Sequence, residues 1–460
     1  MAPETKAYAS ASDVLQEEWE KLSRQLCGRV LTEKDKAYDE ARLQWNLDLL
    51  KRPSHIIRCE SVSDVQLAVK FCRKHSLEPT VAGGRHSPYC FKDDTVAIDL
   101  EGLHGVHVDT DKRIAHVQGG ARLKHLDSEC AIHGLHVVAG HNSTTGVAGL
   151  TLGGGVGYLS PFWGLTVDSF PSAQLVTAEG EIVEVSDDLH PELMWALRGS
   201  GWNYGIVTRF DFALRPVTTV FAGVAQWPLS YETSSMITEL VRVVYDEFTD
   251  LALTVAFANP DGQQPIAICQ PCALDPEKGQ QDWESAKARV ALPPPLMEQV
   301  GPRPYRELQA MMEPMQPPSH IYEKGWLIRD FTTQVADEVV DALAERPFPG
   351  CVMALAPFGK AANGVSDEAT AFFNRKSRFW LLILGFFPEG ADNRQKAMDW
   401  SRKAHGAFAE YSTGRYISVL GGIEEDKMDS IYGANLQRLQ EVKRQWDPHN
   451  FFHHNRNVKP

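Results

Sequence analysis

Two hydrophobic patterns alternate along the first half of the chain. Apolar side chains recur at helical spacing after residue 62, where Ser63 and Gln66 predict a capping box at the start of a helix. A second helical pattern covers residues 123–130, and Gly134 is placed to end it. Short β-branched runs between these helices predict strands at 95–100, 114–118, 173–177 and 182–185, the last two joined through Glu179-Gly180.

The pattern changes between residues 220 and 405. Long strand candidates at 251–258 and 379–387 alternate there with amphipathic helices at 234–248 and 333–344. A chain of 460 residues also exceeds the length at which one hydrophobic core usually stops growing. We therefore predict an α+β protein with a second lobe in this region. The last residues, 432–460, carry one helix that Asp447-Pro448 closes, followed by a tail rich in aromatic and amide side chains.

Composition and charge narrow the classes of partner. With 60 acidic and 46 basic residues the formal net charge is -14, which disfavours nucleic acid and anionic membranes as partners. The longest apolar run, Phe379 to Phe387, is well short of the roughly 20 residues that span a bilayer. The first residues lack the apolar centre of a secretory signal. We therefore expect a cytoplasmic protein.

Familiar motifs for metals, hydrolysis and phosphate transfer are missing from the sequence. His104 and His107 are close together, as are His133 and His136, but neither pair has a metal site's helical spacing with an added carboxylate. There is no Gly-x-Ser-x-Gly and no phosphate loop ending in Gly-Lys-Thr. We expect no catalytic metal and find no support for a hydrolase or a kinase.

Three glycine clusters, at residues 81–87, 118–120 and 146–157, carry the strongest chemical signal. Glycine permits positive φ and close approach, so successive N–H groups of a loop can point at one anion. A diphosphate fits such a cradle, to which Arg85 could add charge, and Ser87 and residues 143–145 hydroxyl groups. Any one cluster alone could serve turns only. The spacing Gly153-x-Gly155-x-Gly157 is a poor match to the Rossmann fingerprint.

Four segments of the sequence resemble one known family in their order along the chain. Gly83-Gly84-Arg85-His86-Ser87 resembles its flavin-attaching loop, and residues 143–155 resemble its second flavin loop. Residues 195–199 with 203–208 are similar to its segment around the adenine end, and residues 432–435, 446–452 and 455–457 to its C-terminal signature. The family is that of the FAD-linked oxidases of the vanillyl-alcohol oxidase and p-cresol methylhydroxylase superfamily, in the berberine-bridge-enzyme-like branch.

The resemblance implies a fold and an activity. It implies an FAD domain (1–217) of the p-cresol methylhydroxylase type, a substrate domain (218–405) with an antiparallel sheet, and a C-terminal segment (406–460) that returns to the FAD domain. It also implies that hydride passes from a small alcohol, a sugar or a specialised metabolite to FAD, and that electrons then pass to dioxygen with release of hydrogen peroxide. The residues it assigns to FAD are Gly83, Gly84, Arg85, His86, Ser87, Gln118, Gly119, Gly120, Asn142, Ser143, Thr144, Gly146, Gly149, Thr151, Gly153, Gly154, Gly155, Gly157, Gly205, Ile206, Val207, Asn455 and Asn457.

The same resemblance makes specific expectations for the flavin. His86 matches the family histidine that is covalently bonded to the flavin ring, although a loop histidine could also form only a hydrogen bond. Many relatives carry a second bond from a cysteine, but this chain has Asn142 at that position, so we expect a single link. Thr151 falls near the flavin edge where oxygen approaches. His141 faces either the ring or solvent.

The sequence offers several candidates for the group that accepts the substrate proton. The family often uses a tyrosine in a Tyr-x-Asn-Tyr segment, whereas this chain reads Tyr416-Ile417-Ser418-Val419 and lacks the second tyrosine. Tyr89 follows the attachment loop directly, and we rank it above Tyr416 as the base, with Arg85 as a possible source of positive charge beside it. The other candidates are Tyr432, Glu424 and Glu425.

The sequence is also compatible with two other functions. A dehydrogenase would keep the flavin but reduce an acceptor other than oxygen. A flavin-holding cyclase or binding protein would show no redox turnover, and the missing tyrosine at Val419 is the reason to consider it.

Overall fold

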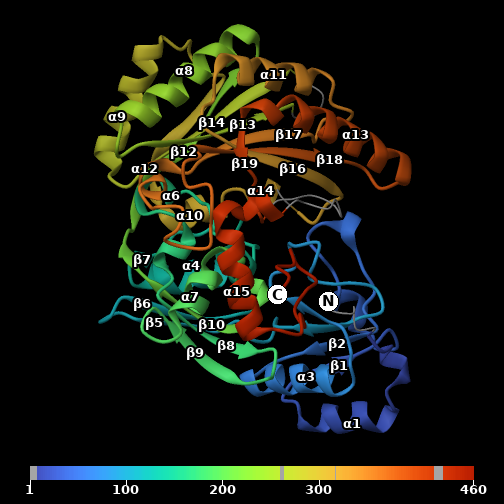
Figure 1. The fold of residues 1–460 in the computed structure, drawn as a ribbon. Helices are drawn as coiled ribbons and strands as arrows, with labels where there is room; N and C mark the ends of the chain where they lie inside the picture. Colours follow the sequence, from blue (N-terminus) through green and yellow to red (C-terminus); the bar gives the residue numbers. More distant parts are fainter. Residues whose placement is uncertain (1–7, 260–263, 316, 419–427) are drawn as a thin grey trace.

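A computed structural model describes residues 8–259, 264–315, 317–418 and 428–460. The protein has an α+β fold with two halves (Figure 1), in which one large sheet occupies the upper half and smaller sheets the lower. The first described residues and the C-terminal residues both lie in the lower half.

Two sheets form the framework of the lower half. The first has the order β1-β2-β4-β3, in which β4 pairs in parallel with β2 and with β3. The second is antiparallel with the order β5-β6-β10-β8-β9. A two-stranded ribbon joins β7 to β11. The strands of these three sheets are β1 (Arg29–Leu31), β2 (His55–Arg58), β3 (Pro79–Ala82), β4 (Val96–Asp99), β5 (Val106–Asp109), β6 (Ile114–Gln118), β7 (Leu135–His136), β8 (Ser172–Thr177), β9 (Ile182–Ser186), β10 (Gly205–Ala213) and β11 (Arg215–Pro216).

The helices of the lower half bury one apolar side each. Helix α3 begins after Ser61, whose side chain forms a capping box with Asp64, and it buries Val65, Val69 and Cys72. Helix α4 ends near Gly134, which adopts a φ of +63° that glycine tolerates best. The helices of this half are α1 (Gln16–Gln25), α2 (Tyr38–Ala41), α3 (Val62–Lys74), α4 (Leu123–Ile132), α5 (Val147–Leu152), α6 (Ser160–Trp163), α7 (Pro191–Ser200), α14 (Met428–Tyr432) and α15 (Leu436–Trp446).

An eight-stranded antiparallel sheet forms the upper half. Its order is β15-β12-β14-β13-β17-β18-β16-β19, and its long apolar strands favour burial on both faces. The strands are β12 (Thr219–Pro228), β13 (Ala252–Ala258), β14 (Ile266–Ala273), β15 (Met297–Pro304), β16 (Ile321–Ile328), β17 (Val352–Pro357), β18 (Phe379–Phe386) and β19 (Ser412–Gly414).

The two faces of this sheet meet different neighbours. Helices α8, α9, α11 and α13 cover the outer face (Figure 1), where Trp283, Val339 and Trp400 share one buried cluster with the strands. The inner face turns toward the lower half, and there Val156 and Leu165 pack with Leu327. The helices of this half are α8 (Tyr231–Glu247), α9 (Pro276–Val290), α10 (Tyr305–Ala310), α11 (Thr333–Ala344), α12 (Gly359–Asn363) and α13 (Ala391–Ala407).

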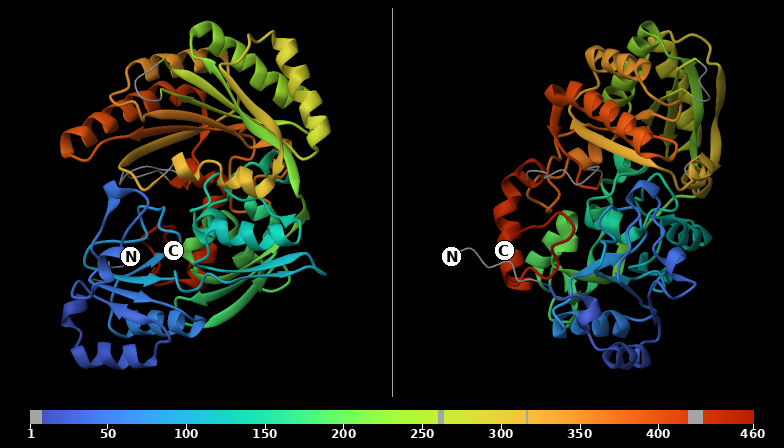
Figure 2. Two further views of the ribbon diagram at one scale, coloured as in Figure 1. Left: turned by 180° about the vertical axis from the view of Figure 1, so that it is seen from behind. Right: turned by 90° about the vertical axis from the view of Figure 1, so that its right-hand side faces the viewer.

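The C-terminal residues leave the large sheet and lie against the lower half (Figure 2). Helix α15 packs on α7, where the guanidinium of Arg438 lies 3.9 Å from the Trp195 ring centroid and also pairs with Glu192. Strand β19, at residues 412–414, still belongs to the large sheet. The division of the chain at residues 217 and 405 remains a proposal.

Most elements predicted from the sequence are present with small shifts. The hairpin of β8 and β9, helix α11 and the helix that ends at Asp447 are confirmed. The predicted capping box was wrong by two positions, because Ser61 and Asp64 form it instead of Ser63 and Gln66. The side chain of Asp64 also accepts hydrogen bonds from the Cys27 and Gly28 amides, an interaction that no local pattern reveals.

Candidate functional site

Two glycine loops of the lower half touch each other through their backbones. A Cβ atom on Gly84 would lie 2.2 Å from the Gly146 nitrogen, and one on Gly146 would lie 2.4 Å from the Gly84 nitrogen. No residue larger than glycine fits at either position without moving a backbone. This contact holds the loop after β3 beside the loop before α5.

His86 lies at this junction with its ring fixed on two sides. Its imidazole stacks on Trp45 with 5.1 Å between ring centroids and an angle of 10° between planes. Its Nε2 atom is 3.0 Å from the Thr144 hydroxyl oxygen. Burial, helped by the nearby positive charge of Arg122, lowers the pKa of His86 to about 4. The imidazole is therefore neutral at physiological pH.

The hydrogen bonds of Thr144 determine which ring nitrogen carries the proton. The Thr144 hydroxyl donates to the Asn142 side-chain oxygen at 2.7 Å, so its single proton is already used. It can only accept from His86, which places the imidazole proton on Nε2. The electron pair of Nδ1 is then the one left free on the ring.

Arg85 and the 118–120 cluster differ from their expected roles. The Arg85 guanidinium forms ion pairs with Asp99 and Glu101 at 2.8 and 2.6 Å, so its charge is already balanced within the protein. The amides of Gly119 and Gly120 donate to the carbonyl oxygens of Thr208 and Leu103, which leaves neither free for a phosphate. The Gln118 side chain accepts from the Gly105 amide. The sequence could not show these ion pairs and hydrogen bonds, because each partner lies in another segment of the chain.

The predicted hydroxyl donors differ in whether the protein already uses them. Ser143 donates to Glu313 at 2.7 Å, whereas Ser87 accepts from the Tyr89 amide at 3.2 Å and keeps its own O–H as a donor. Further donors are found on the backbone of the attachment loop. Within the described parts of the chain, the amides of Gly84, Arg85 and His86 have no acceptor.

The triple-glycine segment packs tightly against the protein. A Cβ on Gly155 would lie 2.2 Å from the Thr166 hydroxyl oxygen, and one on Gly157 would lie 1.4 Å from the Ala139 carbonyl oxygen. Gly153 and Gly154 are similarly crowded by Ser418 and Phe372. These four glycines have a packing role that applies with or without a cofactor. Gly149 differs, because a Cβ there would meet no atom within 4 Å.

Residues around the triple glycine include two of the predicted functional side chains. Thr151 is fully buried in α5, and among the described residues its hydroxyl has no hydrogen-bond partner. His141 contacts the edge of the Tyr158 ring at 4.5 Å between centroids, and burial lowers its pKa to about 4. Their roles toward a flavin remain proposals.

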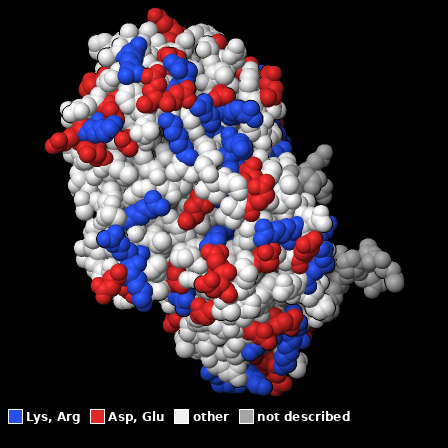
Figure 3. Space-filling model, turned by 60° about the vertical axis from the view of Figure 1, so that its left-hand side comes forward, with Lys and Arg blue, Asp and Glu red and all other residues white. Residues whose placement is uncertain are grey.

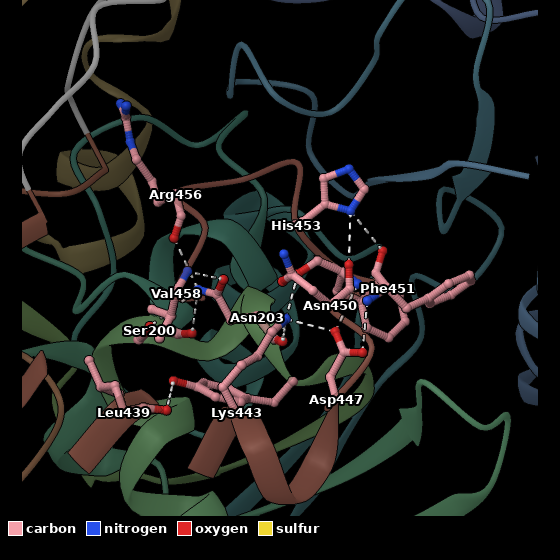
Figure 4. A network of polar contacts seen from close by, with 12 residues as sticks. Ser200, Asn203, Leu439, Lys443, Asp447, Asn450, Phe451, His453, Arg456 and Val458 are labelled. Carbon is pink, nitrogen blue, oxygen red and sulfur yellow. Dashed lines mark hydrogen bonds and ion pairs between the residues drawn. The ribbon is translucent and has the colours of Figure 1, made fainter. Parts of the chain in front are cut away.

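The segments matched to the adenine end meet the C-terminal tail. Gly205, Ile206 and Val207 begin β10. Just before them, the Asn203 side chain accepts from the Val458 amide and donates to the Arg456 carbonyl oxygen. Figure 4 shows this network continuing into α15. In the tail itself, Asn455 is partly buried, and the buried side-chain oxygen of Asn457 has no hydrogen-bond partner among the described residues.

A buried ion pair anchors the tail to α15. The Lys443 ammonium donates to Asp447, to the Asn203 carbonyl oxygen and to the Phe452 carbonyl oxygen, each at 2.7 Å. Asp447 in turn accepts from the amides of Phe451 and Phe452. All three Lys443 donors are thereby satisfied, as a buried charge requires. In Figure 4 the Arg456 side chain points away from this network.

Arg456 reaches one of the three candidate phenols. Its guanidinium donates to the Tyr89 hydroxyl oxygen at 2.6 Å and lies 4.7 Å from the centroid of the same ring. The sequence analysis missed Arg456, although it lies between Asn455 and Asn457. The cation expected beside Tyr89 is thus Arg456, since Arg85 is paired elsewhere.

The other predicted bases are less suited to accept a proton, or lie outside the described residues. The Tyr416 hydroxyl accepts from the Gly155 amide at 3.1 Å, and burial raises its pKa. Burial also raises the pKa of Tyr432, which belongs to the core of the lower half. Val419, Glu424 and Glu425 lie outside the described residues.

A cavity of about 570 Å³ opens beside the second loop. It lies where α4 of the lower half meets α10 of the upper half, and Ser143 and Glu313 are part of its lining. Asp127 in its wall accepts from the Gln309 side chain, and burial raises the pKa of this carboxyl group to about 7. The cavity borders the second glycine loop without including the attachment loop.

Acidic and basic side chains are interspersed on the face shown in Figure 3. Searching the described residues for metal sites finds no group of three or more His, Cys, Asp or Glu side chains that could hold an ion. A membrane-spanning helix is likewise missing from the part of the chain that the structure describes.

The residues present fit FAD at the junction of the two loops. The three unpaired amides after Gly83, the open space at Gly149 and the unpartnered Asn457 oxygen supply donors, room and an acceptor on neighbouring segments. The neutral imidazole of His86 supplies a nucleophile at the same place. The cradle is smaller than the sequence predicted, because Arg85, Gly119 and Gly120 are already occupied.

Comparison with known proteins identifies two sequence families and many relatives. A family model for FAD binding domains matches residues 53–186, and one described as berberine and berberine like matches residues 422–459. An FAD-linked oxidoreductase of Dictyostelium discoideum is 29% identical, with 91% of each chain covered. (R)-6-hydroxynicotine oxidase of Paenarthrobacter nicotinovorans is 28% identical and covers 94% of this chain and 97% of its own.

Solved structures share the fold over nearly the whole chain. The crystal structure of 6-hydroxy-D-nicotine oxidase from Arthrobacter nicotinovorans has a TM-score of 0.86 and 26% identity, with 95% of this chain and 98% of that one covered. Glucooligosaccharide oxidase from Acremonium strictum, whose structure contains 6-S-cysteinyl, 8α-N1-histidyl FAD, has a TM-score of 0.87. Its identity is 19%, with 95% and 98% of the two chains covered, so the likeness is one of fold.

Proposed function

We propose that this chain, which belongs to the FAD-dependent oxidoreductases of the berberine-bridge-enzyme-like branch, oxidises a small molecule and passes the electrons to dioxygen. Its α+β fold is of the p-cresol methylhydroxylase type. The substrate would be an alcohol, a sugar or a specialised metabolite, and hydrogen peroxide would be released. Oxidases among the relatives support this proposal. The single observation that carries it is the junction of His86 with Thr144 and Asn142 between the two glycine loops.

His86 would hold FAD covalently through Nδ1. That nitrogen has the free electron pair, since Thr144 keeps the proton on Nε2. The lowered pKa keeps the imidazole neutral, and stacking on Trp45 limits its rotation. When bound, FAD supplies the two-electron acceptor, while the protein binds it, orients it and controls proton positions.

A single protein–flavin bond follows from the residue at position 142. The relative from Acremonium strictum carries both a cysteinyl and a histidyl link to FAD. In this chain the matching position holds Asn142, whose side chain instead accepts hydrogen bonds from the Thr144 amide and hydroxyl. An amide side chain cannot replace a thiolate as nucleophile, so we propose one link only.

Tyr89 would be the phenol that contacts the substrate. Its position three residues after His86 and its bond to Arg456 place a donor and a cation beside the attachment loop. Tyr416 is instead occupied in holding Gly155, and Tyr432 lies in the core. Gly83, Ser87, Thr151 and Asn455 are retained as proposed FAD neighbours.

One set of measurements tests this function. The purified protein should be yellow, and its flavin should stay with the polypeptide after acid precipitation. Anaerobic mixing with alcohols, aldoses, amines and phenolic compounds should bleach the flavin with at least one of them, and air should restore the colour with release of peroxide. Bleaching without reoxidation in air would favour a dehydrogenase. No bleaching by any compound would favour a binding protein.

A further inference from the structure

One carboxyl group on the inner face of the large sheet stands apart from its apolar surroundings. Because side chains alternate along a strand, Glu323 lies on the same face of β16 as Leu327, which packs against Val156 of the lower half. The alternate residues Tyr322 and Trp326 face α13: Tyr322 packs there on Met398, and the Trp326 indole donates to the His405 carbonyl oxygen. Glu323 therefore points toward the half that contains the flavin loops.

The environment of Glu323 is that of a carboxyl group without a fixed partner. Among the described residues nothing donates a hydrogen bond to it, although Glu323 is only partly exposed. Burial raises the pKa of this carboxyl group to about 7, and the positive charge of Arg456 opposes that rise. Arg456 in turn bonds to Tyr89. The side chain is thus ready to take up or release a proton near neutral pH.

The sheet beside this carboxyl group is tightly packed. A Cβ on Gly325, two residues along the same face, would lie 2.9 Å from the Leu381 carbonyl oxygen and 3.1 Å from the indole nitrogen of Trp380. That indole N–H is buried and has no acceptor among the described residues. The Trp380 ring is held edge-to-face against Tyr416 with 4.8 Å between centroids. Glu323 is therefore the polar, partly exposed side chain next to a closely packed apolar stretch of the inner face.

We propose that Glu323 accepts the proton of the substrate's hydroxyl or amine group. This role rests on the proposed function. The substrate would contain a carbon that bears both hydrogen and an O–H or N–H group. Bound FAD would supply the acceptor for the electron pair of the C–H bond as hydride. The O–H or N–H bond would break with the proton passing to the Glu323 carboxylate, and a C=O or C=N double bond would form.

Glu323 suits this role better than the phenols do. A phenol has an ordinary pKa of about 10, so it needs strong stabilisation to accept a proton at neutral pH. Tyr416 has a pKa raised further by burial. Among the described residues, the charge that acts on Glu323 is that of Arg456, which also bonds to Tyr89. Leu384, its partner across the strand pair, carries no charge.

The test compares Glu323→Gln with a matched control in the same sheet. Glu298→Gln, on edge strand β15, changes a glutamate that bonds to Trp283 and Lys287 on the outer side. Anaerobic flavin reduction with a substrate found by the bleaching screen should slow by roughly 10²–10⁴-fold in Glu323→Gln and stay unchanged in the control. Glu323→Asp, which keeps an acid group, should recover part of the rate.

A second measurement on the same proteins needs no substrate. Infrared titration should show carboxyl absorption that disappears as the pH rises through about 7 in the wild type and in Glu298→Gln. In Glu323→Gln its amplitude should be smaller, because only Asp127, whose pKa burial also raises to about 7, still contributes. Equal rates of flavin reduction in wild type and Glu323→Gln, or an unchanged carboxyl titration, would overturn the role of Glu323 alone. A wild-type protein without FAD would overturn the proposed function instead.

Discussion

The ring of Trp45 lies parallel to the imidazole of His86, with 5.1 Å between their centroids. Trp45 belongs to a segment before β2, and its backbone amide and carbonyl bridge the two halves by bonding to the Arg85 carbonyl oxygen and the Ser319 amide. The next residue, Asn46, bonds to the backbone of Ile321 at the start of β16. A single short segment thus contacts both the attachment histidine and the strand that carries Glu323.

Thr144→Val should reduce covalent attachment of the flavin. The change keeps the shape of the side chain but removes the oxygen that holds His86 Nε2, so the proton can move to either nitrogen and the ring can turn. We expect FAD to remain bound, with a severalfold larger fraction released by acid. Thr144→Ser, which retains the hydroxyl group, is the control. Equal acid release from Thr144→Val and wild type would contradict the assignment of the tautomer.

His86→Ala should bind FAD without a covalent bond and lose most of its turnover. The backbone amides of the attachment loop remain in the variant, so contacts with the diphosphate are kept. Peptide mapping of the wild type should place flavin on the peptide that contains His86. Flavin found on a peptide carrying any of the eight cysteines would refute the single link.

Tyr89→Phe and Tyr416→Phe should have different effects. Loss of the Tyr89 hydroxyl removes one acceptor of the Arg456 guanidinium, and we expect flavin reduction to slow by about tenfold. Loss of the Tyr416 hydroxyl leaves the buried Gly155 amide without an acceptor, which should cost about 1–3 kcal/mol of unfolding free energy. Denaturant melts and stopped-flow reduction on both variants measure these effects. A rate collapse in Tyr416→Phe alone would reverse the ranking of the two phenols.

His55→Phe should make the protein more resistant to acid. Burial lowers the pKa of His55 to about 4, and its ring stacks on Trp19 with 3.9 Å between centroids. An unfolded histidine titrates near 6.5, so the unfolded chain binds more protons between these values and stability falls as the pH drops from 6.5 to 4. For one histidine this loss is on the order of 2–3 kcal/mol at pH 4.

Phenylalanine keeps the stacked ring and cannot titrate, so the acid-unfolding midpoint of His55→Phe should move to lower pH. His133→Phe, at an exposed position, is the matched control. Identical midpoints in wild type and His55→Phe, measured by circular dichroism, would show that this histidine contributes nothing to acid unfolding.

Asp447→Ala should destabilise the protein by about 3–5 kcal/mol, because it leaves the buried Lys443 ammonium without its counter-charge. Two backbone amides of the tail lose their acceptor at the same time. Glu192→Ala breaks an exposed pair with Arg438 on the same helix and should cost at most about 1 kcal/mol. Similar unfolding midpoints for the two variants would refute the importance of the buried pair.

The sequence predicts elements well where the signal is local. Helix α11 and the β8–β9 hairpin follow from apolar spacing and turn residues that are adjacent in the chain. It predicts side-chain partners poorly where they come from distant segments. Arg85 carries charge in a glycine loop, yet the fold places Asp99 beside it. Glu323 reads as an ordinary strand residue, and only the packing of Leu327 on the lower half reveals which way it points.

The anchored tail has a consequence for how the protein is made. Asn203 and Val458, joined by a hydrogen bond at 2.9 Å, are 255 positions apart. At synthesis rates of about 5–20 residues per second, the ribosome needs roughly 10–50 s to produce the second partner after the first. The lower half must wait that long, with part of its apolar surface uncovered, while the entire large sheet is translated. A C-terminal deletion that removes Val458 would leave the Asn203 side-chain oxygen without this donor and the lower core without this side chain.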